Sequence, residues 1–215
     1  MKIFSTETKI YQRLTEYSAI LLTGIMWLLL FLPVVTAGAS CTAMSRMMLN
    51  IREDKSAGVA LFFKTFAKEF KRSTVIWLIM LIVPAAVLAL YLFTDITSSA
   101  AVAVIFVFVA LWIISLMYVF PLNAYFENTV SGTLKNSLLM ALSHIKSTLP
   151  LLLITLLPLF VYAVIGNRLF IYTVPVWIFV LLPFMEYWKS YFLLRVFYDY
   201  VPEEQQTAFR ISQED

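Results

Sequence analysis

Residues 97–120 read TSSAAVAVIFVFVALWIISLMYVF, an apolar run without a charged residue or a histidine. A helix of roughly 17 to 25 apolar residues is long enough to cross a bilayer. Four further runs carry no charged residue or histidine in their interior: Tyr17 to Ala37, Thr74 to Phe93, Thr148 to Ile165 and Leu169 to Met185. The sequence therefore predicts a polytopic membrane protein with five spanning helices.

The composition agrees with this class. Of the 215 residues, 61% are hydrophobic and 13% are charged, and the mean hydropathy is +0.86, which is typical of membrane proteins rather than of soluble domains. No polar stretch is long enough for a second, soluble domain, so we expect a single membrane-embedded domain over residues 1–215. Cys41 is the only cysteine, which excludes an intrachain disulfide and predicts a buried, inert thiol.

The basic residues are distributed unevenly among the segments that connect the apolar runs. Seven lie between the first and second runs, and none lies between the second and third. If the N-terminus is outside and the C-terminus is cytoplasmic, twelve of the 16 lysine and arginine residues fall on the cytoplasmic side, as the positive-inside rule requires. Lys2, Lys9 and Arg13, in the N-terminal tail, are the main exception to this distribution.

Two connections are very short, Thr94-Asp95-Ile96 and Gly166-Asn167-Arg168, which predicts two tight helical hairpins whose turns face outward. Each hairpin follows a segment with helical periodicity, residues 56–72 and residues 133–146, and we expect both segments to be amphipathic helices on the cytoplasmic side. The apolar faces of these helices consist of Val59, Phe62, Phe63, Phe66 and Phe70 in the first, and of Leu134, Leu138, Ala141, Leu142 and Ile145 in the second. The predicted fold is thus all-α, with one spanning helix followed by two units of amphipathic helix plus hairpin.

An aromatic segment, residues 186–200, continues beyond the fifth apolar run as a helix too apolar to be a free tail. Glu186 and Lys189 lie three residues apart on one face of this helix, where the two charges neutralise each other. Its tyrosine and tryptophan residues suit a membrane interface. We interpret the segment as a structural interfacial helix, and Glu186 is the acidic side chain to test first if it forms a binding site.

Small residues follow the first apolar run in the stretch PVVTAGAS, residues 33–40. Small side chains allow close approach between helices, so we interpret this stretch as a packing joint, with a ligand contact as the alternative. The candidate residues of the joint are Pro33, Thr36, Gly38 and Ser40. Asn123 and Glu127, close to the end of the third run, are further candidates for a polar site at a helix end.

A basic face occupies one side of the first amphipathic segment. It consists of Lys64, Lys68, Lys71 and Arg72. Such a face binds anionic lipid headgroups of the inner leaflet, or alternatively it serves only to set the topology.

The charge-free spans lack the residues that most ion-coupled proteins use. A proton relay needs carboxylates and a voltage sensor needs arginines inside the membrane. His144 is the only histidine, and the sequence contains neither a Gly-x-Ser-x-Gly elbow nor a glycine-rich phosphate loop. We therefore expect no catalytic activity, no cofactor, no metal site and no nucleic-acid binding. An enzyme would require polar residues such as Glu127, His144 and Glu186 to converge at the inner surface.

Several stretches resemble the YesL-like family of bacterial integral membrane proteins of unknown function. They are LPVVTAGAS (residues 32–40), FFKTFAKEFK (62–71), FPL (120–122) and LKNSL (134–138), and the resemblance extends over most of the chain. It implies a multi-pass protein of the bacterial plasma membrane, often associated with carbohydrate uptake or breakdown systems. It implies no established activity and no catalytic residues.

From these observations we predict a non-catalytic accessory protein or interaction partner of membrane machinery, such as a subunit of a sugar importer. The alternative is a small transporter or channel whose cavity is built from kinked helices, amides and aromatic residues instead of charges. A continuous polar cavity bordered by Asn123, Thr36 or Glu186 would favour transport, and a solid apolar interior would favour the accessory role. Substrate and oligomeric state do not follow from the sequence.

Overall fold

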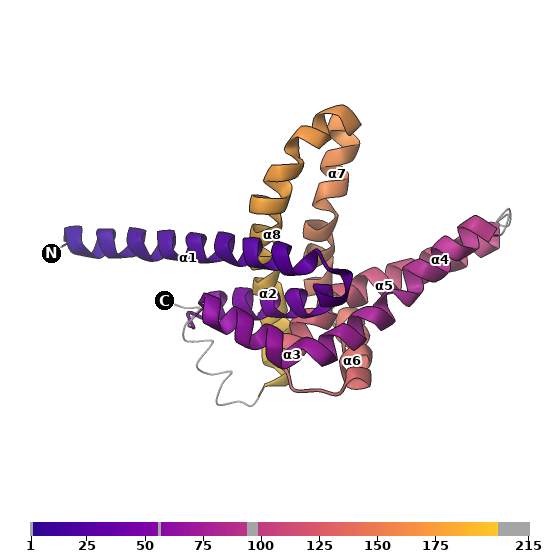
Figure 1. Ribbon diagram of the computed structural model, residues 1–215, viewed down its shortest axis with the longest axis horizontal. Coiled ribbons are helices and arrows are strands. Elements are labelled where there is room, and N and C mark those ends of the chain that lie inside the picture. The colour runs from indigo at the N-terminus through magenta and orange to yellow at the C-terminus, as the bar shows by residue number, and fades with distance from the viewer. Residues whose placement is uncertain (1, 56, 94–98, 202–215) are drawn as a thin grey trace.

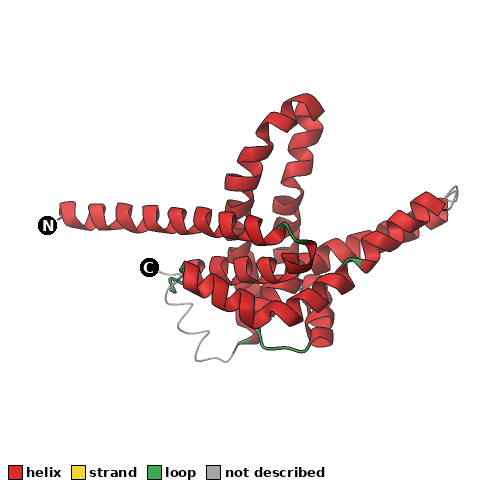
Figure 2. Cartoon of the chain, in the orientation of Figure 1, coloured by secondary structure: helices red, strands yellow, loops and turns green. Residues whose placement is uncertain are grey.

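The computed structural model describes residues 2–55, 57–93 and 99–201. Every regular element within these residues is helical, and short loops join the helices (Figure 2). Five helices in the described part are long and apolar enough to cross a membrane: Arg13–Phe31, Val59–Phe93, Ser99–Tyr125, Ile145–Asn167 and Leu169–Tyr200. The predicted class, an all-α membrane protein with five spanning helices, is confirmed.

The first spanning helix, α1 (Lys2–Phe31), ends earlier than predicted. The expected span to Ala37 is wrong because Pro33 has no N–H to donate and forces the residue before it out of helical geometry. A short 3₁₀ turn, η1 (Val34–Thr36), follows, and Ala37 begins a new helix, α2 (Ala37–Arg52).

Helix α2, which the sequence analysis did not predict, lies at the centre of the protein. It folds back against α1 and also contacts α3, α5 and α8. Its methionines pack with residues of α1 and α3 in one apolar cluster, of which the buried members are Ile20, Met26, Ala43, Met44, Met47, Met48, Ile51 and Phe62. Met44, Met47, Met48 and Ile51 recur at the helical spacing i, i+3, i+4 and i+7 and form an apolar stripe, but neighbouring helices bury the other sides of α2 as well.

The next unit consists of α3 (Val59–Met80) and α4 (Ile82–Phe93). The predicted boundary between an amphipathic helix at 56–72 and a span from residue 74 is wrong, because α3 runs straight through it. The break comes instead at Leu81. Pro84 removes the N–H that would bind the carbonyl of Met80, and the indole N–H of Trp112 donates to this carbonyl at 2.7 Å.

Helices α5 (Ser99–Tyr125) and α6 (Val130–Ser143) follow. Helix α5 extends past the predicted end at Phe120 and α6 begins before the predicted residue 133, because the side chain of Thr129 caps its N-terminus. On the predicted apolar face of α6, Ala141 is buried but Leu142 is exposed.

The last hairpin consists of α7 (Ile145–Val176), the π-helical stretch η2 (Trp177–Leu181), α8 (Leu182–Phe197) and the 3₁₀ turn η3 (Tyr198–Tyr200). The chain reverses within α7 at Gly166, whose φ of 74° suits glycine. This turn lies where the sequence predicts it, whereas the turn predicted at 94–96 lies outside the described residues. The predicted extension 186–200 continues the fifth span through α8 without an interruption.

Three helical arms leave the central group of helices in different directions (Figure 1), and the two arms that are hairpins are apolar. The three arms are the N-terminal half of α1, the hairpin of α4 and α5, and the hairpin of α7 and α8. Large side chains on the arms are exposed, including Phe93 at 83%, Phe106 at 73% and Tyr172 at 81%. Lipid covers such surfaces in a membrane at no desolvation cost. The polar residues described next lie in the core from which the arms extend.

Candidate functional site

Helices α2 and α3 cross in close contact at Gly38. A Cβ atom at this position would lie 2.4 Å from the carbonyl oxygen of Ser73 and 2.6 Å from the Cβ of Trp77. Only a residue without a side chain therefore permits this approach of the two helices. In the turn before α2, the hydroxyl of Thr36 donates to the carbonyls of Leu30 and Pro33, and within the first turn of α2 the hydroxyl of Ser40 donates to the carbonyl of Ala37.

A buried polar cluster lies beside this crossing. The hydroxyls of Thr42 on α2 and Ser73 on α3 are 2.9 Å apart, and the amide nitrogen of Asn123 on α5 donates to Ser73 at 2.9 Å. All three side chains are buried. The amide oxygen of Asn123 is buried as well and has no hydrogen-bond partner among the described residues. The three hydroxyl and amide groups hold together three helices that are distant in sequence.

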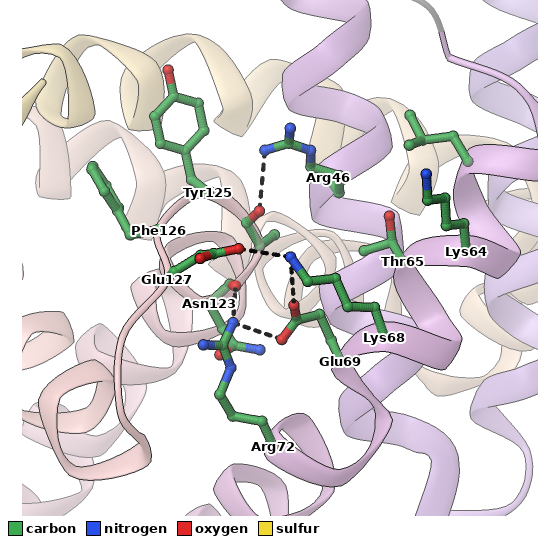
Figure 3. A pocket seen from close by; sticks show the side chains of 12 residues that line it. Arg46, Lys64, Thr65, Lys68, Glu69, Arg72, Asn123, Tyr125, Phe126 and Glu127 are labelled. Carbon is green, nitrogen blue, oxygen red and sulfur yellow. Dashed lines mark hydrogen bonds and ion pairs between the residues drawn. The ribbon is translucent and has the colours of Figure 1, made fainter.

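A cavity of about 270 Å³ opens next to the polar cluster, between α2, α3 and the C-terminal end of α5 (Figure 3). Glu69 lies in its wall, only 7% exposed, and pairs with Arg72 at 2.6 Å. Arg72 also donates to the carbonyls of Asn123 and Asn128, and Arg46 donates to the carbonyl of Ala124 at 3.2 Å. The last backbone carbonyls of a helix have no hydrogen-bond partner within the helix. At the end of α5, Arg46 and Arg72 donate hydrogen bonds to such carbonyls.

Two of the predicted candidates border this cavity in different environments. Asn123 is buried, whereas the carboxylate of Glu127 is exposed and accepts a hydrogen bond from Lys68 at 2.8 Å. That hydrogen bond, with the charge of Lys68, lowers the pKa of Glu127 below its ordinary value. The structure therefore places both residues at one cavity but gives them separate partners.

The predicted basic face divides into two parts. Lys64 and Lys71 are exposed, and neither forms an ion pair within the described residues. Lys68 pairs with Glu127. The assignment of Arg72 to a membrane-surface face is wrong, because its side chain is only 23% exposed and is bound to Glu69 and to the end of α5.

A second cavity, of about 280 Å³, lies where the arms diverge and is lined mostly by apolar side chains from α1, α2, α3, α5, α7 and α8. Glu186 and Lys189 contribute an ion pair to its wall. The indole nitrogen of Trp77 is buried and has no partner among the described residues. Trp27 donates to the sulfur of Cys41 at 3.4 Å, and burial raises the pKa of this thiol to about 12.

The acidic and histidine side chains that an enzyme would need do not converge. Glu127 borders the first cavity and Glu186 the second. His144 lies elsewhere, with its Nε2 atom 3.0 Å from the hydroxyl of Tyr200. Within the described residues, no group of three or more metal-ligating side chains is found.

Sequence reasoning missed several polar residues that organise the core. Glu53 at the end of α2 accepts hydrogen bonds from Tyr125 and Tyr198 and pairs with Lys55. Arg52 donates to the carbonyl of Tyr187 at 3.0 Å, and its guanidinium lies over the Tyr187 ring. The partners are up to 145 residues apart, so spacing along the chain carried no signal for them. The pair Glu69 and Arg72 did have a signal, the i, i+3 spacing on a helix.

Comparison with known proteins gives one match. No curated protein and no solved structure matches the chain. Residues 20–92, which contain α2, α3, most of α4 and the Gly38 crossing, match a family model described as "Protein of unknown function, DUF624", and this match is consistent with the YesL-like resemblance.

Proposed function

We propose that this chain is a non-catalytic integral membrane protein that acts as an interaction partner of other membrane machinery, in particular of a carbohydrate importer. The observation that carries the proposal is the division of the polar residues between two cavities. Asn123 borders one cavity and Glu186 the other, and the two cavities share no lining residue. Polar groups so divided provide no continuous path for a solute through the described residues, which favours a partner role over transport.

The arms supply the surface for such a partner. Each hairpin exposes large apolar residues over its length, such as Phe106 on α5 and Tyr172 on α7, and the hairpins diverge (Figure 1). The spaces between diverging arms in a bilayer are filled by lipid or by helices of another protein. The link to carbohydrate uptake rests on the family resemblance alone.

The proposed placement is the bacterial plasma membrane, with the core and the C-terminus on the cytoplasmic side. The start of α1, the end of α4 and the Gly166 turn all lie far from the core (Figure 1), and the core carries most of the described basic residues. The concentration of basic residues in the core supports a cytoplasmic core under the positive-inside rule, and the external N-terminus rests on the same count of basic residues. The exposed Lys64 and Lys71 would face the anionic lipids of the inner leaflet.

Photo-crosslinking in living cells tests the partner role. A photoreactive residue is placed at Phe106 or Tyr172, which are exposed, and at Met117, which is 7% exposed, as the interior control. We expect the arm positions, but not Met117, to yield an adduct with a sugar-importer subunit, and deletion of the gene to lower uptake of the corresponding sugar. If neither arm position traps a transporter subunit and uptake of every tested sugar is unchanged, the proposal is rejected.

A small transporter is the second candidate, and one observation favours it. The two cavities come within about one helical turn of each other, since Ser73 and Asn123 lie by the first and Trp77 and Phe120 line the second. The buried polar cluster would then be a closed gate. Flux of a panel of mono- and disaccharides into proteoliposomes would be slowed by Asn123→Leu but not by Asn136→Leu on α6. Equal flux into protein-free liposomes would exclude this function.

A further inference from the structure

The cavity between α2, α3 and the end of α5 carries more positive than negative charge. Its lining includes four cationic and two anionic side chains: Arg46, Lys64, Lys68, Arg72, Glu69 and Glu127. Figure 3 shows these side chains around one space, with Lys64 and Glu127 on opposite sides of it. A cavity with an excess of one sign of charge concentrates ions of the opposite sign.

The two carboxylates of the cavity are already occupied. Glu69 binds Arg72 at 2.6 Å, and Glu127 binds Lys68 at 2.8 Å. Arg46 and Lys64 remain, and neither has a carboxylate partner among the described residues. The surplus charge of the cavity therefore resides on these two side chains, which come from different helices.

The donors of these side chains are largely unused. Arg46 uses one N–H to bind the carbonyl of Ala124, and a guanidinium has five N–H donors. Lys64 has three ammonium protons, and the hydroxyl of Thr65 also borders the cavity. An anion with several oxygens satisfies such a set best, since arginine matches the geometry of phosphate and lysine binds it as a point charge.

We propose that this cavity binds a phosphate group, carried either by the headgroup of an anionic phospholipid or by a soluble phosphorylated molecule. The cavity lies at the end of the apolar part of α5 and beside the segment of α3 that precedes its apolar part, which is the level of lipid headgroups in the proposed placement. The site is independent of the partner role proposed above. The proposed site also differs from a general attraction of anionic lipid to the basic face of α3, because binding at the site requires Lys64 and not Lys71.

Lys64 and Lys71 provide a matched pair of test positions. Both are exposed lysines on α3, and they lie seven residues apart on the same side of the helix. Only Lys64 borders the cavity. Lys64→Gln removes one cation of the proposed site, and Lys71→Gln removes the same charge outside it. Neither side chain has an ion pair in the described residues, so both variants should fold, which a melting curve checks.

The experiment uses the full chain in two arms. In the first, the protein in nanodiscs of neutral phosphatidylcholine is titrated with inorganic phosphate. In the second, native mass spectrometry counts the phosphatidylglycerol retained by protein purified from mixed vesicles of phosphatidylcholine and phosphatidylglycerol. We expect binding in at least one arm, weakened about tenfold by Lys64→Gln, as for loss of a charge-assisted hydrogen bond, and unchanged within about twofold by Lys71→Gln, as for an exposed charge.

The two arms identify the source of the phosphate. Binding of inorganic phosphate that depends on Lys64 indicates a soluble ligand, and retention of phosphatidylglycerol that depends on Lys64 indicates a lipid headgroup. Equal weakening by the two variants would show a diffuse basic surface and would overturn the proposal. Binding in neither arm, or binding that neither variant changes, would overturn it as well. None of these outcomes bears on the trapping of an importer subunit.

Discussion

The substitution Gly38→Ala tests the close crossing of α2 and α3. The added methyl group would lie 2.4 Å from the carbonyl oxygen of Ser73 and 2.6 Å from the Cβ of Trp77. Both contacts are with the backbone or with the first side-chain atom, so no rotamer change relieves them. The two helices must separate, which also lengthens the hydrogen bond between Thr42 and Ser73.

Three contributions determine the size of the effect. Overpacking of a tight contact costs about 1 to 3 kcal/mol, and weakening the buried hydrogen bond costs about 1 kcal/mol. Alanine is favoured over glycine in a helix by about 1 kcal/mol, which acts in the opposite direction. The net loss in the free energy of unfolding is about 2 kcal/mol, which corresponds to a fall of roughly 4 to 8 °C in the melting temperature of a chain of this size.

Thermal melting of the purified protein in detergent, followed by circular dichroism, measures this shift. The sign of the shift in melting temperature shows whether α2 and α3 meet at Gly38. If α2 and α3 do not meet at Gly38, helix propensity alone acts, and Gly38→Ala should raise the melting temperature by roughly 2 to 4 °C. An unchanged or raised melting temperature would refute the crossing, and with it the position of the cavity beside it.

Three further predictions follow from particular contacts. Glu69→Gln should lower the free energy of unfolding by about 3 kcal/mol, because it leaves a half-buried arginine without its counter-charge. Glu127→Gln should change the free energy of unfolding by less than about 0.5 kcal/mol, because that ion pair is exposed. Equal losses for the two variants in chemical denaturation would contradict the structure. Trp112→Phe should lower the free energy of unfolding by about 1 kcal/mol, because the carbonyl of Met80 loses its indole donor. This loss should disappear in a Pro84→Ala background, where the alanine N–H binds the same carbonyl. Additive effects in a double-mutant cycle would argue against the hydrogen bond between Trp112 and Met80. Cys41 should react with maleimide more slowly than an ordinary thiol, because burial raises its pKa to about 12 and so lowers the thiolate fraction. Rapid labelling of the folded protein would show that this thiol is not shielded.

The five spanning helices could be predicted because hydrophobicity is a local property. The cost of placing a segment in lipid is close to a sum over its own residues, so a charge-free run such as 97–120 is recognised without knowledge of its neighbours. The turn at Gly166 could be found in the same way, from a short polar interruption between two such runs. The break at Leu81 also has a local cause in Pro84, although the helical periodicity before it suggested a different boundary.

Helix α2 could not be predicted as a central element by this reasoning. Its sequence mixes small, polar and methionine residues with Arg46 and Arg52, so it is too polar for a spanning helix. The apolar spacing of Met44, Met47, Met48 and Ile51 indicates one buried face, not burial on the other sides. It is buried because several other helices surround it, and its small residues allow them to approach. That arrangement depends on contacts between distant parts of the chain.

For the candidate site, the sequence by itself determined the residue types and the helix on which the lysines lie, since a period of 3.6 places Lys64, Lys68 and Lys71 on one side. Only the tertiary structure decided that Arg72 binds the end of α5 and that Asn123 and Glu186 border separate cavities. The physical reason is that helix formation and transfer into lipid depend on neighbouring residues. The partners of a polar side chain depend on how helices rotate and cross, which is set by packing between segments far apart in the chain.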